Sequence, residues 1–376
     1  MDMLKKVLAV FMSVVMAAFG LVGITGNVSD DYTDGKYKNV ILMIGDGMGF
    51  NTLQATEEIT GESLTMKTMP VQLTSDIDSF IIPYTDSAAG GTALSTGMRV
   101  WINSLAVFPF APGGINNMNV PISLGELVKA NGKATGVVTT DQTSGATPSA
   151  FSAHATARSM EADISADQLK NGFDLIWGAE TESINAENTA ANGWTYVTNE
   201  DELMALEEGS RSFAQFNFDD LKYTTNNYNT PTVEEMTSKA IDLLSADEDG
   251  FFLMVEGACI DKHAHNNEME NVNLATLEFD KAVKAALDFA KADGETLVVV
   301  TADHSTGGIT YDENAGEWIF THGTHDFWDV PVFVSAEDAG FVSDIEIKNR
   351  QIPVQIARVM GYGEEQFPAS ILSLQQ

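Results

Sequence analysis

The chain contains little cysteine and few basic residues. Cys259 is the only cysteine among its 376 residues, so no disulfide can form within the chain. Only 20 lysines and arginines stand against 54 acidic residues, which leaves a formal net charge of −34. This charge argues against nucleic acid or an anionic membrane as a partner, because both repel an acidic surface. Acidic surfaces also keep proteins soluble in concentrated salt, so we expect a saline habitat.

No apolar run is long enough to span a membrane, except for one at the N-terminus. Lys5 and Lys6 precede an apolar run from Val7 to about Ile24, and a polar stretch follows it. This order is typical of a secretory signal peptide, which we predict over residues 1–26. An uncleaved membrane anchor is the alternative, because the run is slightly long for a signal peptide. Export predicts a periplasmic or extracellular protein with no stable membrane association after the signal is removed.

Internal repeats, low-complexity tracts and proline-rich linkers are missing as well, so residues 27–376 are predicted to form a single domain. Hydrophobic residues make up 44% of the chain, which is enough for a large core. Continuous apolar runs, which are typical of buried parallel strands, recur along the chain. They cover Asn39–Ile44, Ala134–Thr139, Phe173–Trp177, Phe251–Val255, Leu297–Thr301 and Pro331–Val334.

Helical patterns separate several of these runs. A capping box at Thr232–Glu235 predicts a helix that ends near Leu244. Apolar residues recur at helical spacing from Val272 to Lys291, until Gly294 ends the pattern. Strands that alternate with helices predict an α/β fold, a three-layer sandwich with a central, mostly parallel sheet flanked by helices. Two polar segments, 181–230 and 103–119, are predicted to be surface excursions.

Acids, a threonine and a histidine follow the predicted strands. Because ligands bind beyond the carboxyl ends of the strands in such sheets, we expect these residues to converge on one edge. A buried acid is unfavourable unless it is paired or bound to metal, and the chain has too few bases to pair them all. The residues concerned are Asp46, the segment Thr140–Thr147, Glu256, Asp303 and His304.

Five of the six histidines fall into three short clusters. In the first, Asp261 and His265 are four residues apart, so they share one face of a helical turn, as metal ligands from a single element should. His263 then points elsewhere. The second cluster is Asp303-His304, and the third runs from His322 to His325. The remaining histidine, His154, is predicted to be an ordinary core or surface residue.

The residue types of these clusters indicate which metals they bind. Histidine combined with carboxylate, without cysteine, favours zinc in a catalytic role, because structural zinc prefers thiolates. An all-oxygen set of Asp46, Thr147 and Glu256 suits magnesium instead.

The segment Tyr84–Gly97 places one hydroxyl, that of Ser87, among small residues directly after Asp86. A serine hydroxyl is nearly inert at neutral pH, so it needs a base or a metal to react as a nucleophile. An ordinary helix N-cap is the alternative interpretation of the same residues.

In their order and spacing, these motifs resemble those of the bacterial alkaline phosphatases, from about Lys38 to the end of the chain. The motifs are Ile44–Gly49, Thr85–Ala88, Ala146–Pro148, Arg158, Val255–Gly257, Ile260–Lys262, His265, Thr301–His304 and His325. The resemblance implies a first zinc ion held by Asp261, His265 and His325. It implies a second zinc ion held by Asp46, Asp303 and His304, and a magnesium ion held by Asp46, Thr147 and Glu256.

The resemblance also implies roles for the remaining residues. Ser87 is the nucleophile, activated by the second zinc ion, and it forms a phosphoserine intermediate. Arg158 holds the phosphoryl oxygens, and Asp86 orients Arg158. His325 is preferred to His322 as a zinc ligand because its offset from Pro331 resembles the family pattern.

One position departs from the family pattern. Many relatives carry Asp or His two residues before the magnesium-binding threonine, but this chain has Gly145 there. The acidic partner of Lys262 would have stood at this position. We therefore expect that part of the magnesium surroundings to be missing or supplied elsewhere, and the reach of Lys262 to phosphate or water stays open.

The function that follows is that of a secreted, metal-dependent alkaline phosphatase that hydrolyses small phosphate monoesters, and the resemblance implies a homodimer. A phosphodiesterase or another hydrolase of the same superfamily is one alternative, although a sulfatase would need a proline that Ser87-Ala88-Ala89 lacks. A non-catalytic secreted protein that binds metal or phosphate is the other alternative.

Overall fold

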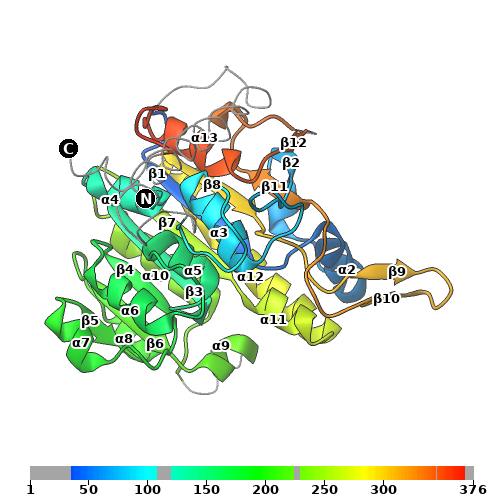
Figure 1. The fold of residues 1–376 in the computed structure, drawn as a ribbon, viewed down its shortest axis with the longest axis horizontal. Helices are drawn as coiled ribbons and strands as arrows, with labels where there is room; N and C mark the ends of the chain where they lie inside the picture. Colours follow the sequence, from blue (N-terminus) through cyan, green and yellow to red (C-terminus); the bar gives the residue numbers. More distant parts are fainter. Residues whose placement is uncertain (1–34, 108–119, 224–228, 344, 369–376) are drawn as a thin grey trace, which may run out of the picture.

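The structure is a computed structural model that describes residues 35–107, 120–223, 229–343 and 345–368. The predicted signal peptide lies outside these residues. A ten-stranded sheet crosses the centre of the molecule, and helices cover both of its faces (Figure 1). The predicted three-layer α/β fold is therefore confirmed. None of the described helices is long and apolar enough to cross a membrane.

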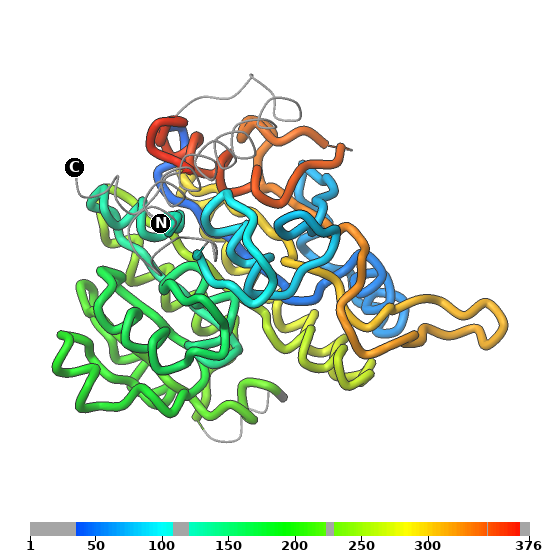
Figure 2. Tube along the Cα trace, viewed as in Figure 1, coloured from blue at the N-terminus to red at the C-terminus, as the bar shows by residue number. Residues whose placement is uncertain are grey.

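The central sheet is parallel except at one strand. β11 runs antiparallel to both of its neighbours, β2 and β8. In spatial order the strands are β12 (Glu346–Ile347), β2 (Val71–Ser75), β11 (Val330–Val334), β8 (Thr296–Thr301), β1 (Asn39–Gly45), β7 (Phe251–Gly257), β3 (Ala134–Gln142), β4 (Leu175–Ala179), β6 (Ser212–Phe216) and β5 (Thr195–Val197). A separate antiparallel pair, β9 (Thr310–Asp312) and β10 (Glu317–Ile319), projects from the body of the protein (Figure 2).

The helices begin and end where local signals predict. The Thr232 side chain caps α10 in a capping box, and Gly294 ends α12 in the left-handed conformation. The α-helices are α2 (Phe50–Thr60), α3 (Ser87–Thr96), α4 (Leu124–Ala130), α5 (Ala146–Ser152), α6 (Glu161–Lys170), α7 (Ala186–Ala191), α8 (Glu200–Met204), α9 (Phe218–Tyr223), α10 (Val233–Leu244), α11 (Cys259–His265), α12 (Met269–Asp293) and α13 (Gln351–Val359). Two short 3-10 helices cover Thr65–Thr68 and Glu337–Ala339.

The central strand β1 packs on both faces, which explains its continuous apolar sequence. Ile41 and Met43 belong to a core that also contains α10 and α12 residues such as Met236 and Phe279. Their neighbours Val40, Leu42 and Ile44 belong to a second core on the other face. Because successive side chains of a strand point to opposite faces, a strand buried on both sides favours apolar residues at successive positions.

The prediction of a surface excursion over residues 181–230 is wrong in part. β6 lies inside this segment, is buried throughout and pairs with β4 and β5. Its polar side chains are satisfied internally, since Trp177 donates to Ser212 Oγ over 2.9 Å and Gln215 donates to Thr143 Oγ1 over 3.0 Å. Buried polar groups with such partners fit a core strand, although they make its sequence look like a loop.

The predicted excursion at 103–119 is also only partly correct. Ser104, Leu105, Ala106 and Val107 are buried, and Leu105 bridges to Ala155. The remainder of the segment, residues 108–119, lies outside the described residues.

The side chain of His154 is only 8% exposed, and both of its ring nitrogens contact oxygen atoms, as expected of a core histidine. Nδ1 lies 3.1 Å from the carbonyl oxygen of Ala106, and Nε2 lies 2.8 Å from Glu126 Oε1. Its backbone N–H donates to Asp167 Oδ2 over 2.9 Å. His154 therefore joins α4, α6 and the segment that precedes residue 108.

This contact predicts that stability falls at alkaline pH. Burial alone would lower the pKa of His154, but the carboxylates of Glu126 and Asp167 outweigh it and raise the pKa to about 9. A histidine whose pKa is raised on folding stabilises the fold fully below about pH 6.5 and loses that contribution as the pH rises through 9, here up to ~3 kcal/mol. We expect His154→Gln to melt at a lower temperature at pH 6 and to show a flatter pH dependence up to pH 10. Parallel curves for the two proteins would contradict this prediction.

Candidate active site

Two groups of side chains at one edge of the sheet each bring three potential ligand atoms within 4.8 Å of one another. The groups are Asp261, His265 and His325, and Asp46, Asp303 and His304. These are the two sets that the sequence analysis assigned to two metal ions. The structure thus brings together residues from four separate stretches of the chain.

Strand register places these residues at the same level. Ile44 on β1 is the register partner of Glu256 on β7 and of Thr301 on β8. Asp46 and Asp303 therefore leave the sheet side by side, each two residues beyond this level. β7 continues directly into α11, which carries Asp261 and His265 on one face with Oδ2 and Nε2 3.3 Å apart.

The third histidine cluster contributes His325 rather than His322. The His325 ring stacks on the His304 ring with centroids 3.7 Å apart, and its Nε2 lies 3.9 Å from Asp261 Oδ1. His322 instead pairs with Asp326, with Nε2 and Oδ1 3.1 Å apart. His325 and not His322 therefore lies with Asp261 and His265.

His263 points away from both groups, as predicted. Its Nδ1 lies 2.6 Å from Glu268 Oε2, and its Nε2 lies 2.9 Å from the carbonyl oxygen of Lys222. It therefore supports α11 without reaching the candidate metal ligands.

Thr306 connects the two groups, and sequence reasoning missed it. Its hydroxyl donates to Asp261 Oδ1 over 2.5 Å and lies 3.2 Å from His304 Nδ1. An isolated threonine three residues beyond Asp303 carries no signal in the sequence. Its contacts depend on the turn that brings it back over α11.

Ser87 is the first residue of α3, and its hydroxyl lies beside the second group. Ser87 Oγ is 3.3 Å from His304 Nε2. Asp86 is the N-cap of the helix and accepts a hydrogen bond from the Ala89 N–H over 3.1 Å. The N-cap interpretation is thus correct for Asp86, and it coexists with a position of Ser87 that suits a nucleophile at a positive helix end.

The small residues of α3 let the helix lie directly against the end of β8. A Cβ atom at Gly90 would lie 2.9 Å from the carbonyl oxygen of Asp303, closer than real Cβ contacts allow. A larger residue at this position would push α3 away from the site. Gly90 therefore allows the close approach of α3 that brings Ser87 next to His304.

Asp86 also holds Arg158. The guanidinium donates to Asp86 Oδ2 over 3.2 Å, and the Arg158 backbone N–H donates to the carbonyl oxygen of Asn103 over 2.8 Å. The Asn103 N–H in turn donates to Asp86. This arrangement fixes Arg158 close to Ser87, while the side chain stays partly exposed to solvent.

Three oxygen atoms of the set that the sequence analysis predicts to bind magnesium are buried and have no hydrogen-bond partner among the described residues. They are Asp46 Oδ1, Thr147 Oγ1 and Glu256 Oε1. Burial, followed by the nearby Asp141, raises the pKa of Glu256 to about 8, and burial with Asp303 raises that of Asp46. Oxygen ligands of this kind are those that magnesium prefers, so the atoms fit a bound cation.

Lys262 has an acidic partner, but at a different position from the one sequence reasoning considered. Its Nζ lies 2.8 Å from Asp141 Oδ1. Asp141 thus provides the acidic partner of Lys262 that Gly145 cannot provide. Asp141 was missed as an individual residue, although it belongs to the segment that follows the second apolar run.

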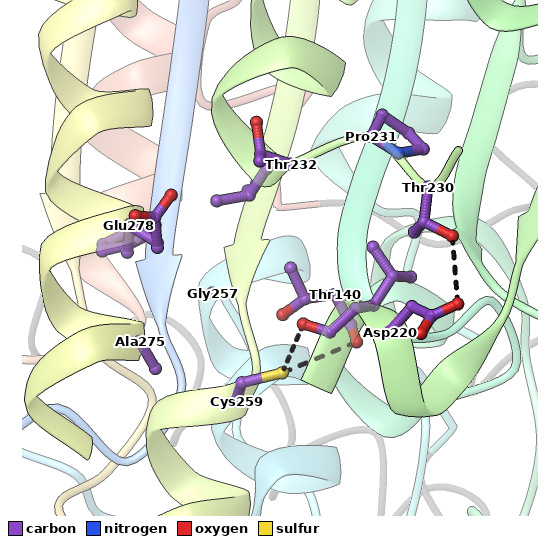
Figure 3. A pocket seen from close by; sticks show the side chains of 12 residues that line it. Thr140, Asp220, Thr230, Pro231, Thr232, Gly257, Cys259, Ala275 and Glu278 are labelled. Carbon is purple, nitrogen blue, oxygen red and sulfur yellow. Dashed lines mark hydrogen bonds between the residues drawn. The ribbon is translucent and has the colours of Figure 1, made fainter. Parts of the chain in front are cut away.

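The single cysteine does not take part in the site. Cys259 lines a small cavity of about 30 Å³, where its thiol contacts the carbonyl oxygens of Thr140 and Leu221 (Figure 3). Burial raises the pKa of the thiol to about 11. A thiol that stays protonated at neutral pH is neither a nucleophile nor a metal ligand.

Comparison with known proteins gives consistent results. A family profile described as alkaline phosphatase matches residues 37–186 and 178–359. The chain is 32% identical over 330 residues to alkaline phosphatase 3 of Bacillus subtilis (strain 168). The aligned region covers 82% of this chain and 68% of that protein. It is 31% identical over 351 residues to the alkaline phosphatase of Escherichia coli (strain K12). This aligned region covers 75% of this chain and 73% of that protein.

Solved structures show the same fold. Alkaline phosphatase from the Antarctic bacterium TAB5 matches with a TM-score of 0.73 and 27% identity, over 88% of this chain and 100% of that chain. The Thermus thermophilus alkaline phosphatase matches with a TM-score of 0.78 over 93% of this chain and 98% of that chain, although only 17% of residues are identical. With the family profile spanning most of the described residues, the resemblance found in the sequence is confirmed, and the chain belongs to the alkaline phosphatase family of metal-dependent phosphatases.

Proposed function

We propose that this enzyme is a secreted phosphomonoesterase that hydrolyses small phosphate monoesters through a phosphoserine at Ser87, with two zinc ions and one magnesium ion. The single observation that carries the proposal is the position of Ser87. Its hydroxyl lies 3.3 Å from His304, whose ring stacks on that of His325. A serine at a helix N-terminus, in contact with His304 of the second candidate metal group, can receive a phosphoryl group.

The side chains present fit these ions. Histidine nitrogens and carboxylate oxygens without thiolates are the donors of catalytic zinc sites. The buried, unpaired oxygens of Asp46, Thr147 and Glu256 fit magnesium. The first zinc ion would be held by Asp261, His265 and His325, and the second by Asp46, Asp303 and His304.

The ions would supply Lewis acidity, which lowers the pKa of an adjacent hydroxyl and stabilises charge on the phosphoryl and leaving oxygens. Ser87 Oγ attacks phosphorus, the bond to the ester oxygen breaks, and the alcohol leaves with a proton. Water then attacks the phosphoserine, which releases inorganic phosphate and restores the serine hydroxyl. Positioning and charge stabilisation account for most of the catalysis of such a transfer.

Arg158 explains a preference for monoesters. Its guanidinium can donate two parallel hydrogen bonds to two non-bridging phosphoryl oxygens, and Asp86 holds it in the orientation that this requires. A diester offers less negative charge to this group, because a second ester bond replaces one of the charged oxygens.

The net charge of the molecule does not oppose this function. Three divalent ions and Arg158 would outweigh the four carboxylates at the site, so a phosphate dianion meets a locally positive surface. The distant acids act weakly on it, because salt screens charges over about 8 Å at physiological ionic strength.

We expect p-nitrophenyl phosphate to be hydrolysed at least ~10²-fold faster than bis-p-nitrophenyl phosphate in the presence of zinc and magnesium, because the diester loses charge-assisted contacts. The measurement is kcat/KM for both esters. Arg158→Ala should narrow the ratio by slowing the monoester more than the diester. Faster diester hydrolysis would indicate a phosphodiesterase instead, and no hydrolysis of either ester would indicate a protein that only binds metal or phosphate.

A further inference from the structure

We propose that Asp141 is the positioning residue of Lys262 in this chain, and that residue 145 must be glycine because the Asp141 carboxylate fills the space beside it. The inference rests on the proposed function in one respect, since it takes Thr147 and Glu256 as ligands of a divalent cation. It concerns two residues that take no part in the assignment of ligands.

The Asp141 carboxylate is fixed from two directions. Its Oδ1 accepts hydrogen bonds from Lys262 Nζ and from the Gln142 N–H, each over 2.8 Å. The Asp141 N–H donates to Thr139 Oγ1 over 2.8 Å, and the Thr139 hydroxyl donates to Glu256 Oε2. One short segment at the end of β3 therefore holds both the partner of Lys262 and a support of Glu256.

Gly145 leaves the space that this carboxylate occupies. A Cβ atom at residue 145 would lie 2.4 Å from Asp141 Oδ2 and 2.7 Å from its Cγ. Any side chain at 145 would displace the Asp141 carboxylate from Lys262. An acid at position 141 thus requires glycine at position 145, and the two positions form one unit in the sense that neither can change alone.

Charge explains what Asp141 contributes. The Lys262 side chain is largely buried, and Asp46 and Glu256 act on it as well as Asp141. Without Asp141, the ammonium group would turn toward Asp46 and Glu256, the residues proposed to bind magnesium. An ammonium group there competes with a divalent cation for the same carboxylates. Asp141 therefore keeps the cation site open by holding Lys262 to one side.

The experiment is a Mg²⁺ titration of the zinc-loaded protein, followed by calorimetry and by the melting temperature, so that no turnover is needed. Removal of groups that support metal ligands weakens metal affinity about 10–100-fold, and we expect a change in this range for Asp141→Asn. Asp174→Asn is the matched control, because it removes a carboxylate that pairs with Lys129 at the surface, over 2.7 Å. Asp141→Asn with the affinity of the wild type would overturn the proposal.

A double-mutant cycle separates positioning from direct binding. In a Lys262→Met background, Asp141→Asn should change Mg²⁺ affinity by less than about twofold, because the group that it controls is gone. Equal losses in both backgrounds would show that Asp141 acts on the cation itself and would overturn its role through Lys262.

The link to Gly145 is tested by moving the carboxylate. Gly145→Asp alone should weaken Mg²⁺ binding, whereas Asp141→Ala combined with Gly145→Asp should bind Mg²⁺ more tightly than Asp141→Ala alone. Additive losses would overturn the inference that the two positions form one unit. A wild-type protein that binds no Mg²⁺ would overturn the proposed magnesium site. A wild-type protein that binds Mg²⁺ with an affinity that Asp141→Asn leaves unchanged would overturn only the role of Asp141, so the two failures are distinguishable.

Discussion

Replacement of Ser87 by alanine should lower the turnover of phosphate monoesters by roughly 10³-fold or more, because the covalent intermediate can no longer form. The methyl group of alanine fits the space of the serine, and α3 keeps its Asp86 cap. The fold and the metal ligands should therefore persist. Any residual hydrolysis would come from direct attack by water on bound substrate.

The measurement is kcat for p-nitrophenyl phosphate, together with binding of inorganic phosphate by calorimetry. Phosphate binding should survive in Ser87→Ala, since Arg158 and the metal ligands remain. Ser95→Ala is the matched control, because it removes a buried serine from the same helix whose hydroxyl donates to the Thr92 carbonyl. Near-normal turnover of Ser87→Ala would remove Ser87 from the role of nucleophile.

Removal of metal should abolish activity and lower the melting temperature by about 10 °C or more. A ligand present at 100 times its dissociation constant stabilises a protein by about 2.7 kcal/mol, and the three proposed ions would act together. The metal-free site also contains Asp46, Asp303 and Glu256, whose pKa values burial and neighbouring acids raise, so these groups would bind protons in place of cations. Activity and melting are measured after chelation and dialysis.

Added zinc and magnesium should restore both properties of the dialysed protein. Ser87→Ala should show the same loss of melting temperature on chelation, because stabilisation by metal does not require turnover. Activity that persists after complete chelation and dialysis would show that the metal-dependent mechanism is wrong.

The central strands could be predicted from the sequence because burial on both faces selects the continuous apolar runs Val40–Ile44 in β1 and Leu297–Val300 in β8. β6 could not, since its Ser212 and Gln215 find partners that lie far away in the sequence. A sequence shows whether a side chain is polar, but not whether a residue far along the chain provides a buried hydrogen-bond partner for it. The prediction of a surface excursion over the polar segment 181–230 is therefore wrong for β6, which lies within it.

The candidate site shows the same division. Acids at strand ends were predictable, because the edge of a parallel sheet brings them together whatever the loops do. Which of His322 and His325 faces Asp261 depends on the turn between them. The two are distinguished by contacts that a sequence does not display, since His325 stacks on His304 and His322 pairs with Asp326. Asp141 was passed over because its contact with Lys262 depends on the space above Gly145, which a sequence does not display.

The most direct test of the account is detection of the phosphoserine itself. The zinc- and magnesium-loaded enzyme is mixed with p-nitrophenyl phosphate, quenched in acid and digested with trypsin, and the peptide from residue 68 to Arg99 is fragmented in a mass spectrometer. The account predicts one added phosphoryl group on Ser87 and none on Ser75, Ser79 or Ser95 of the same peptide. Steady turnover with phosphate on another residue, or on none under conditions that trap acid-stable intermediates, would contradict it.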